Sequence, residues 1–526
     1  MAAKVKGKSH PPKASPHASA NRAPGKSAGA SRESAQPATG QPGSAPNSSN
    51  DSGWTPQGSE VGIRVRMYRV GFGDFFLITC QPKPNDYVHF IIDCGVFKGT
   101  SQTGDIGSIE AAVANMAAVT EGQIALIMCT HRHADHIAGF ARCEATFSKF
   151  TVQAVWMSVW ESQYPQALKF QADLADTAAT LQTHFANLGA AASDDQNTAR
   201  KFMENATGET GAGSNANALK LLKGFRNSPP SYYQGGQNPA LPPAFQQAGI
   251  GAKILGPPPI ADVQLMKLMD LQKGVGQYLA SPGAVDSKAD APFGKIWEVD
   301  VGEFYRPEAF SEWCAVRGTP GPPSQAAADE ARQHMEKALK QAQPDAALVA
   351  ATALNSFLNN QSLVVLFTFK GKNLLFVGDA QAGNWEHWIF GTDDPDKKAS
   401  GTICEEAQKI LTSLDFYKVG HHGSGNATPI AVVNMMKKGS HQFPAMCSTQ
   451  KGVYGKEAPH DPTAGTEVPR IPLLSALGAA TALVRSDQID VSVDGKDEPA
   501  MVNDPLPNST GGTRFERGAL WIDCFL

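Results

Sequence analysis

Short runs of hydrophobic residues, separated by Gly, Pro and Asn, recur in two distant parts of the chain. Runs of about four to eight residues rich in Val, Ile and Phe are typical of β-strands. In the first part the runs cover residues 61–70, 74–80, 88–95, 124–130 and 152–160. In the second part they cover residues 362–371, 373–380, 415–420, 442–449, 481–493 and 519–526. The pattern therefore predicts two strand-rich halves.

A different spacing, with hydrophobic residues three and four positions apart, predicts helices. It occurs at residues 106–119, 167–188 and 324–343. The last two helices lie within a stretch, about residues 161–349, whose other segments are polar and rich in Gly, Asn and Pro. We interpret this stretch as a long, mainly helical insertion into an α/β domain. The core of that domain then comprises about residues 60–160 and 350–526.

The first 53 residues differ in composition from the rest. Residues 1–53 consist mainly of Ala, Ser, Pro, Gly, Asn and Lys and show no hydrophobic periodicity. Such a segment cannot bury enough apolar surface to offset the entropy of ordering it, so we expect a disordered tail. It carries seven Lys and Arg against only Glu33 and Asp51, so it is a basic tail that polyanions could attract, although a solvated tail without a partner is the simpler interpretation. Residues 54–526 then form one domain.

Charge and cysteine usage narrow the classes of function. The chain of 526 residues has a formal net charge of -4 at pH 7, which gives no overall basic surface and supports nucleic-acid binding only weakly. Its eight cysteines form no CxxC pair and mostly lie in hydrophobic runs, as expected for free thiols in a reducing compartment. There is no apolar stretch of about 18 residues and no secretory leader pattern. We therefore expect a cytoplasmic protein without a membrane span.

The strongest chemical signal is the hexapeptide that follows the fourth hydrophobic run. In it, His131, His133, Asp135 and His136 have the spacing H-x-H-x-D-H. Imidazole nitrogens and carboxylate oxygens are ligands that Zn²⁺ and similar ions accept, and this close spacing lets one turn direct them at one or two ions. Chance would produce the pattern in roughly one chain in a thousand. A histidine-rich surface loop is therefore a poor explanation, and we predict a metal site.

This hexapeptide resembles the signature of the metallo-β-lactamase superfamily, whose fold is an αββα sandwich. Other segments resemble the remaining motifs of that family in the same order. The run ending at Asp93 resembles the first motif, whose aspartate orients a metal-binding imidazole. The run ending at Asp379 resembles the motif whose carboxylate bridges two metals. The segment DFYKVGHHGS resembles the last motif, which delivers a histidine ligand; we favour His421 over His422 for this role and retain both.

One branch of the superfamily is the most similar. The segment around Asp74, taken with the last motif, resembles the branch that includes the extracytoplasmic hydrolase domain of bacterial competence DNA-uptake proteins. Asp74 is accordingly a candidate supporting residue of the site, although its position between glycines also fits a plain turn. The resemblance covers about residues 60–160 and 350–490, and neither the tail nor the insertion.

The chain departs from the family pattern at one ligand. Many members have a further histidine between the hexapeptide and the bridging aspartate, but here only His184 and His334 occur in that interval, both in predicted helices of the insertion. The first metal position is thus left with His131, His133 and Asp379. We expect one or two divalent ions per chain, with Zn²⁺ favoured and Mn²⁺ as the alternative.

These ligands predict hydrolysis, because a bound metal lowers the pKa of its water and polarises the bond under attack. Asp135 is the candidate for orienting that water. His460, in a Pro-rich loop after a strand, is a candidate proton donor. Ser424, Asn426 and Thr428 lie just past the last motif and could hydrogen-bond a phosphate group.

The substrate is less defined than the reaction. The resemblance implies a phosphoester or phosphodiester, which includes nucleic acid and nucleotides. Hydrolysis of a lactone, a β-lactam or a thioester is one alternative. A non-catalytic metal-binding or regulatory protein is another, since the first metal position lacks a histidine. We also expect the insertion to form a helical cap that restricts access to the site.

Overall fold

The structure is a computed structural model, and it describes residues 54–97, 107–188, 194–208, 214–225, 228–266, 354–390, 402–458, 465–494, 501–508 and 512–526. All of them belong to one unit of the chain, Asp51–Leu526. The predicted tail at 1–53, the predicted helix at 324–343 and two candidate residues, His334 and His460, lie outside the described residues.

The larger sheet has eight strands in the order β17-β18-β1-β2-β3-β5-β7-β8. Antiparallel pairing joins the strands from β17 to β3, and parallel pairing joins β3, β5, β7 and β8. The strands are β17 (Arg514–Arg517), β18 (Trp521–Phe525), β1 (Ile63–Tyr68), β2 (Phe75–Lys83), β3 (Asp86–Cys94), β5 (Leu126–Cys129), β7 (Val155–Ser158) and β8 (Ser231–Tyr233).

A second sheet has six strands in the order β14-β13-β12-β11-β10-β9. Pairing is antiparallel from β9 to β11 and parallel from β11 to β14. The strands are β14 (Thr481–Arg485), β13 (Phe443–Cys447), β12 (Phe416–Lys418), β11 (Lys372–Phe376), β10 (Val364–Phe369) and β9 (Gly251–Gly256). Two short pairs complete the strands, β4 (Gln123–Ile124) with β6 (Thr151–Val152) and β15 (Gln488–Ile489) with β16 (Val502–Asn503).

Aromatic side chains pack the two large sheets face to face. The ring centroids of Phe76 in β2 and Phe376 in β11 are 6.1 Å apart, and those of Phe90 in β3 and Phe367 in β10 are 5.1 Å apart. All four rings are buried in one apolar cluster. Because side chains alternate along a strand, the residue after Phe76, Leu77, belongs to the cluster on the opposite face of its sheet. The chain therefore buries both faces of its central strands.

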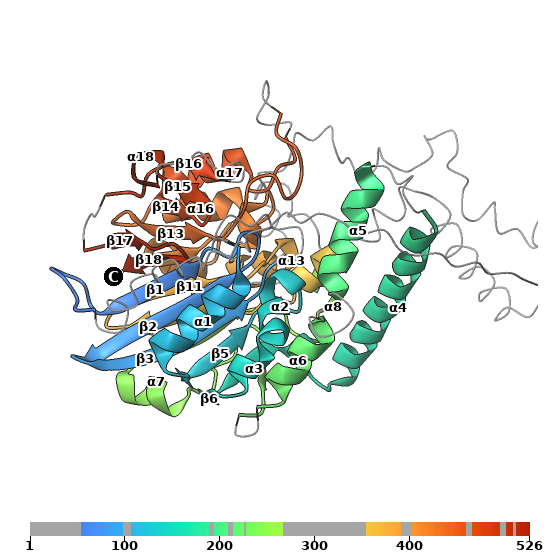
Figure 1. The fold of residues 1–526 in the computed structure, drawn as a ribbon, viewed down its shortest axis with the longest axis horizontal. Helices are drawn as coiled ribbons and strands as arrows, with labels where there is room; N and C mark the ends of the chain where they lie inside the picture. The colour runs from blue at the N-terminus through green and yellow to red at the C-terminus, as the bar shows by residue number, and fades with distance from the viewer. Residues whose placement is uncertain are drawn as a thin grey trace, which may run out of the picture. The chain divides into compact units, whose positions relative to one another are not determined.

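Helices cover the two outer faces. On the larger sheet, apolar residues of α1 (Ile109–Thr120), α2 (Ala134–Arg142), α3 (Glu144–Phe147) and α6 (Asn215–Lys223) share a cluster with the outward residues of β2, β3 and β5. On the second sheet, α13 (Ala382–Phe390), α15 (Glu405–Thr412), α16 (Ile430–Met436) and α17 (Ile471–Gly478) do the same. Figure 1 shows α1 and α2 over the blue strands and α16 and α17 beside β13 and β14. The order of layers is helix, sheet, sheet, helix.

The helix predicted at residues 106–119 is confirmed as α1, which begins three residues later than predicted, at Ile109. Ser108 precedes the helix, and its hydroxyl accepts a hydrogen bond from the Ala111 N–H at 3.1 Å, which satisfies one of the unpaired amides of the first turn. The helix buries Ile109, Ala112, Val113 and Met116, the residues whose three- and four-residue spacing predicted it.

The predicted insertion is helical at first and then joins the sheets. Its helices are α4 (Pro165–Leu188), α5 (Asp194–Thr207) and α6, followed by the shorter α7 (Pro243–Ala248) and α8 (Val263–Met266). Within the same stretch, however, β8 extends the larger sheet beside β7 and β9 forms an edge of the second sheet. The stretch predicted as an insertion therefore also contributes two strands to the large sheets. These strands were missed because three-residue and glycine-rich strands carry too little hydrophobic pattern to be recognised.

Strand ends from both sheets determine where the site lies. β3 ends one residue after Asp93, β5 ends just before the hexapeptide, β11 ends three residues before Asp379, and β12 ends three residues before His421. The strands predicted at these places are confirmed. A short helix, α18 (Val491–Asp494), follows β15. Among the helices that the structure describes, none combines the length and apolar character needed to cross a membrane.

Candidate metal centre

The hexapeptide forms the turn between β5 and α2. His133 is extended and precedes α2, while Asp135 and His136 lie in the first turn of this helix. The backbone around Asp135 is held from outside, because its carbonyl accepts the N–H of Asp74 at 2.8 Å. Gly95 lies so close to this backbone that any side chain there would overlap Asp135. The packing thus fixes the direction in which the side chains of the turn point.

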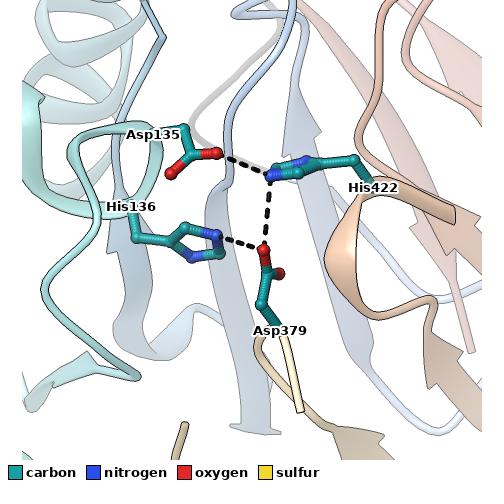
Figure 2. A group of neighbouring side chains, drawn as sticks. All are labelled: Asp135, His136, Asp379 and His422. Carbon is teal, nitrogen blue, oxygen red and sulfur yellow. Dashed lines mark hydrogen bonds and ion pairs between the residues drawn. The ribbon is translucent and has the colours of Figure 1, made fainter. Parts of the chain in front are cut away.

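Four side chains from three separate loops converge into one group (Figure 2). Asp135 and His136 come from the hexapeptide, Asp379 follows β11, and His422 follows β12. Their potential ligand atoms all lie within 4.8 Å of one another, and all four residues are buried. Oδ2 of Asp379 lies 3.1 Å from Nε2 of His136 and 3.5 Å from Nε2 of His422. Oδ2 of Asp135 lies 3.0 Å from the same His422 nitrogen.

The charges of this group favour a bound cation. Burial alone would raise the pKa of Asp379, but the charges of His136 and His422 outweigh it and hold that pKa well below its usual range. Burial would likewise lower the pKa of His136, yet Asp379 and Asp93 raise it well above its ordinary value. Without a metal, protons on the imidazoles would therefore balance the carboxylates, and a divalent cation could replace those protons.

Asp93 holds His136 in position. Its Oδ2 lies 2.8 Å from Nδ1 of His136, so the second ring nitrogen of His136 faces Asp379. The same carboxylate accepts hydrogen bonds from the amide N–H of Thr130 at 2.8 Å and from its hydroxyl at 2.7 Å. Asp93 was predicted to orient a metal-binding imidazole, and that role requires this arrangement.

Asp74 lies behind the group, beside a residue that the sequence did not single out. Nζ of Lys418 forms a close ion pair with Asp74, lies 3.4 Å from Oδ1 of Asp379 and donates to the Gly378 carbonyl at 2.9 Å. Burial opposes the charge of Lys418, but Asp74 and Asp379 outweigh it and raise its pKa. The sequence did contain a signal for this ion pair, because Lys418 lies inside the hydrophobic run at 415–420 and a buried charge needs a partner.

His131 and His133 lie next to the group of four. Nε2 of His131 is 2.9 Å from Nδ1 of His133, and the rings of His131 and His136 are 4.2 Å apart. Burial lowers the pKa of His133 to about 4 and holds the pKa of His131 well below its ordinary value. Both imidazoles are therefore neutral at pH 7, which is the form that binds a metal.

The histidine pair separates into two roles. His422, and not His421, belongs to the group of four, so the preference for His421 as the ligand is not supported by the geometry. His421 contributes its backbone N–H, which donates to Oδ1 of Asp379 at 2.9 Å. Both residues have positive φ, 46° and 51°, and this turn directs the two rings apart. The sequence alone could not reveal the turn.

The ring of His421 lies in its own polar surroundings. Its Nδ1 is 2.6 Å from the Ser424 hydroxyl, 3.1 Å from Oδ1 of Asn426 and 3.1 Å from Nε2 of Gln381. Ser424 and Asn426 were predicted as phosphate contacts, but in the structure their side chains contact the His421 imidazole. Thr428 instead pairs with the Tyr417 hydroxyl at 2.7 Å inside the second sheet.

The residues present fit a metal ion. Two ligand-type atoms of the site, Nε2 of His133 and Oδ1 of Asp135, are buried without a hydrogen-bond partner among the described residues. Nε2 of His136 and Oδ2 of Asp379 make no hydrogen bond there either, although they form an ion pair at 3.1 Å. Burying such atoms unpaired costs free energy unless an ion or water binds them. Nitrogen and carboxylate donors together suit Zn²⁺ and Mn²⁺.

Helices of the predicted insertion contact the hexapeptide directly. Oδ1 of Asn205 in α5 accepts the Asp135 N–H at 3.2 Å, and Nδ2 of Asn215 in α6 donates to the Arg132 carbonyl at 2.8 Å. Glu161 pairs with Arg132 through two contacts of 2.5 and 2.7 Å. These helices therefore support the metal-binding turn, while the predicted cap falls partly outside the described residues. The side chain of His184, in α4, is also outside them.

No family model matches this chain, and no curated protein is significantly similar to it in sequence.

Proposed function

We propose that this chain is a metal-dependent hydrolase of the metallo-β-lactamase superfamily. The observation that carries the proposal is the buried group of Asp135, His136, Asp379 and His422. Its members come from three loops, and the loops of Asp379 and His422 are each more than 200 residues from the hexapeptide in sequence. A bound cation is the simplest reason for bringing two buried carboxylates and two imidazoles together in this way.

The fold supports the same proposal. Two face-to-face sheets with helices on both outer faces are the layer order of the αββα sandwich, which the motif resemblance implies. The site lies where strands of both sheets end, at the edge shared by the two sheets. The layer order alone would suit other functions, so the proposal depends on the side chains at this edge.

Different residues of the site would bind the metal ions and orient the water. Asp135, His136 and His422 would hold one ion, His131 and His133 would hold a second, and Asp379 would face both. When bound, such ions supply a hydroxide nucleophile at neutral pH and polarise the bond under attack. Asp135 keeps Oδ1 without a partner among the described residues, so this oxygen can accept a hydrogen bond from the attacking water. Asp93 keeps Nε2 of His136 directed at the site.

A phosphoester or phosphodiester is the substrate class that we favour. The motif resemblance implies it, and His421, with Ser424 and Asn426 at its ring, presents polar groups beside the metal ligands. His421 is also less buried than His422, so its ring is the more accessible of the two. Hydrolysis of a lactone, a β-lactam or a thioester at the same ions is the alternative for an assay to test.

A non-catalytic metal-binding protein is the second candidate. It is favoured by one observation, that the groups of His, Cys, Asp and Glu found among the described residues contain neither His131 nor His133. A protein of this kind would bind metal at the group of four without hydrolysing generic substrates.

The full-length chain, loaded with Zn²⁺ or Mn²⁺, is to be assayed with bis(p-nitrophenyl) phosphate, nitrocefin and acyl lactones. The variants are Asp379→Ala and His133→Ala, and the matched controls are Asp173→Ala and His441→Ala, which are exposed or half-exposed residues away from the site. We expect phosphodiesterase activity that Asp379→Ala lowers by a factor of about 100 or more. Metal binding with no activity toward any substrate would favour the second candidate.

A further inference from the structure

The first metal position has two imidazoles and lacks an evident third residue of its own. Nε2 of His131 and Nδ1 of His133 face each other at 2.9 Å, beside the group of four. Two neutral nitrogens and a shared carboxylate leave an ion short of ligands, since Zn²⁺ and Mn²⁺ take at least four. A buried polar side chain other than His, Cys, Asp or Glu, close to these two rings, could supply the missing ligand.

The segment before β10 runs along the metal-binding turn. The hydroxyl of Ser362 lies 3.3 Å from Nδ1 of His131 and accepts the Asp379 N–H at 3.0 Å. The next residue, Leu363, donates its N–H to the Thr130 carbonyl at 3.0 Å. The residues just before Ser362 are thus held against the turn that carries the two imidazoles and against Asp379.

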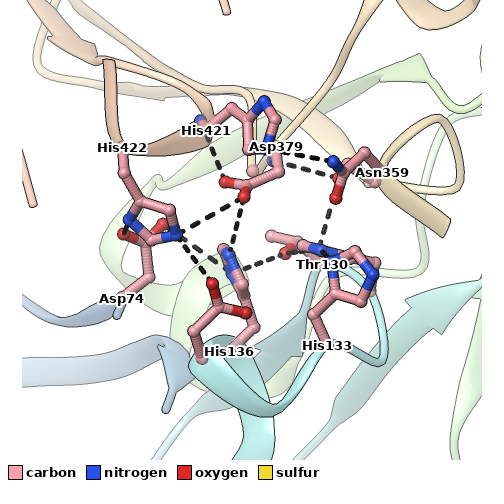
Figure 3. A network of polar contacts seen from close by, with 12 residues as sticks. Asp74, Thr130, His133, His136, Asn359, Asp379, His421 and His422 are labelled. Carbon is pink, nitrogen blue, oxygen red and sulfur yellow. Dashed lines mark hydrogen bonds and ion pairs between the residues drawn. The ribbon is translucent and has the colours of Figure 1, made fainter. Parts of the chain in front are cut away.

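Asn359 is the residue of this segment that faces the site. Its side chain is fully buried, and Nδ2 lies 3.2 Å from Nε2 of His421. Its carbonyl oxygen, Oδ1, is buried without a hydrogen-bond partner among the described residues. In Figure 3, Asn359 lies on the His133 side of Asp379, while Asp74 lies on the opposite side near His422. The contact with His421 therefore occupies the amide nitrogen, while the amide oxygen stays available to a ligand.

We propose that Oδ1 of Asn359 replaces the missing histidine as a ligand at the first metal position, with His131 and His133. The inference rests on the proposed function, and it names the residue that completes the site. An unpaired buried carbonyl is costly unless something binds it, and amide carbonyls are ligands for oxygen-preferring ions such as Mn²⁺. The amide carries no charge. The position is therefore weaker than the one made by Asp135, His136 and His422, and it fills second.

Gln381 is the neighbouring amide that makes a matched control. Its Oε1 is also buried without a partner in the described part of the chain. Its Nε2, however, lies 3.1 Å from Nδ1 of His421, whereas Asn359 approaches the opposite ring nitrogen, Nε2. The two amides therefore flank His421 from different sides, and on our proposal only Asn359 serves the first position.

The experiment titrates the chelator-stripped full-length chain with Mn²⁺ and, separately, with Zn²⁺ by isothermal calorimetry. The unmodified chain should give two binding events of different Kd. Asn359→Ala should weaken the second event about tenfold or more, while Asn359→His should tighten that event for Zn²⁺ by a similar factor. Gln381→Ala should leave both Kd values within about twofold. Circular dichroism of each variant checks that it folds. If the alanine variant fails to fold, the histidine variant still tests the proposal.

Three results would overturn the inference. Two events with unchanged Kd in both Asn359 variants would exclude this ligand and leave the proposed function intact. A single event in the unmodified chain would mean that the first position does not form, again without affecting the group of four. Absence of any metal binding in the unmodified chain would overturn the proposed function together with the inference.

Discussion

Nδ1 of His136 and Oδ2 of Asp93 are 2.8 Å apart, and this contact leaves the other ring nitrogen of His136 facing Asp379 at 3.1 Å. When His136 is neutral and binds a metal, this bond would fix its tautomer, with the proton on the side of Asp93. It also joins the end of β3 to the turn after β5, because Asp93 holds Thr130 as well. A carboxylate outside the metal site therefore sets the orientation of a ligand inside it.

Replacing Asp93 by alanine is expected to weaken metal binding by a factor of about 10 to 100. The imidazole would lose its fixed tautomer, and Thr130 would lose its acceptor. Calorimetric titration with Zn²⁺ measures the change. Asp93→Asn keeps the shape and part of the hydrogen bonding, so its effect should be smaller; an equal or larger effect than that of alanine would contradict an orienting role.

The two adjacent histidines should respond differently to alanine substitution. His422→Ala removes a member of the group of four and should abolish the tighter binding event, because its Nε2 lies within 3.5 Å of both carboxylates. His421→Ala should leave the Kd of that event within about threefold, since only its backbone N–H contacts Asp379. Calorimetry of the two variants side by side decides the assignment, and the opposite result would return the ligand role to His421.

Lys418 should stabilise the metal-free protein more than the metal-bound one. Its ammonium pairs with Asp74 and Asp379 inside the core, so Lys418→Met should lower the free energy of unfolding of the metal-free chain by about 3–5 kcal/mol. A bound cation would compensate Asp379, and the loss should be smaller with metal. Urea denaturation with and without Zn²⁺ measures both. The exposed Lys409, substituted in the same way, serves as the control. Equal losses in the two states would contradict this account.

The pair of Glu161 and Arg132 should give a pH-dependent contribution to stability. Burial would raise the pKa of Glu161, but the guanidinium of Arg132 outweighs it and lowers that pKa. Because the folded pKa is depressed, the contribution is complete above the unfolded value of about 4.3 and is lost as pH falls toward the lower folded value. Glu161→Gln should therefore lower the free energy of unfolding at pH 7 by about 3 kcal/mol. This value is at the lower end of the range for buried pairs, because Arg132 is 18% exposed.

Urea denaturation at pH 7 and pH 3.5 measures that difference between Glu161→Gln and the unmodified chain. The difference should shrink at the lower pH. The exposed pair of Lys169 and Asp173 offers the control, since Asp173→Asn should change stability by less than about 0.5 kcal/mol at either pH. A difference for Glu161 that grows on acidification would contradict the assignment.

The sequence was sufficient to predict the parts of this protein that depend on local sequence patterns. Apart from β8, β9 and β17, the strands of the two large sheets follow from hydrophobic runs, and α1 follows from hydrophobic spacing. The hexapeptide identifies four of the candidate ligands. Residues whose role depends on distant contacts were not predictable in this way. His422 could not be separated from His421 without the left-handed turn that they share. The roles that we assign to Lys418 and Asn359 depend on carboxylates and imidazoles that loops distant in sequence place beside them.

The same limit explains the errors in the middle of the chain. β8 has three residues and β9 begins with Gly251 and Ala252, so neither has a hydrophobic run long enough to stand out from the helical stretch around it. Their places in the sheets depend on partners, β7 and β10, that lie far from them in sequence. Pairing of this kind cannot be read from local pattern.

The most direct test of the central claim is an anomalous difference map from crystals grown with Mn²⁺ or Zn²⁺. We predict a strong peak among Asp135, His136, Asp379 and His422, with a weaker second peak beside His131 and His133. A map with no peak in this group, or with metal bound only elsewhere on the chain, would contradict the account.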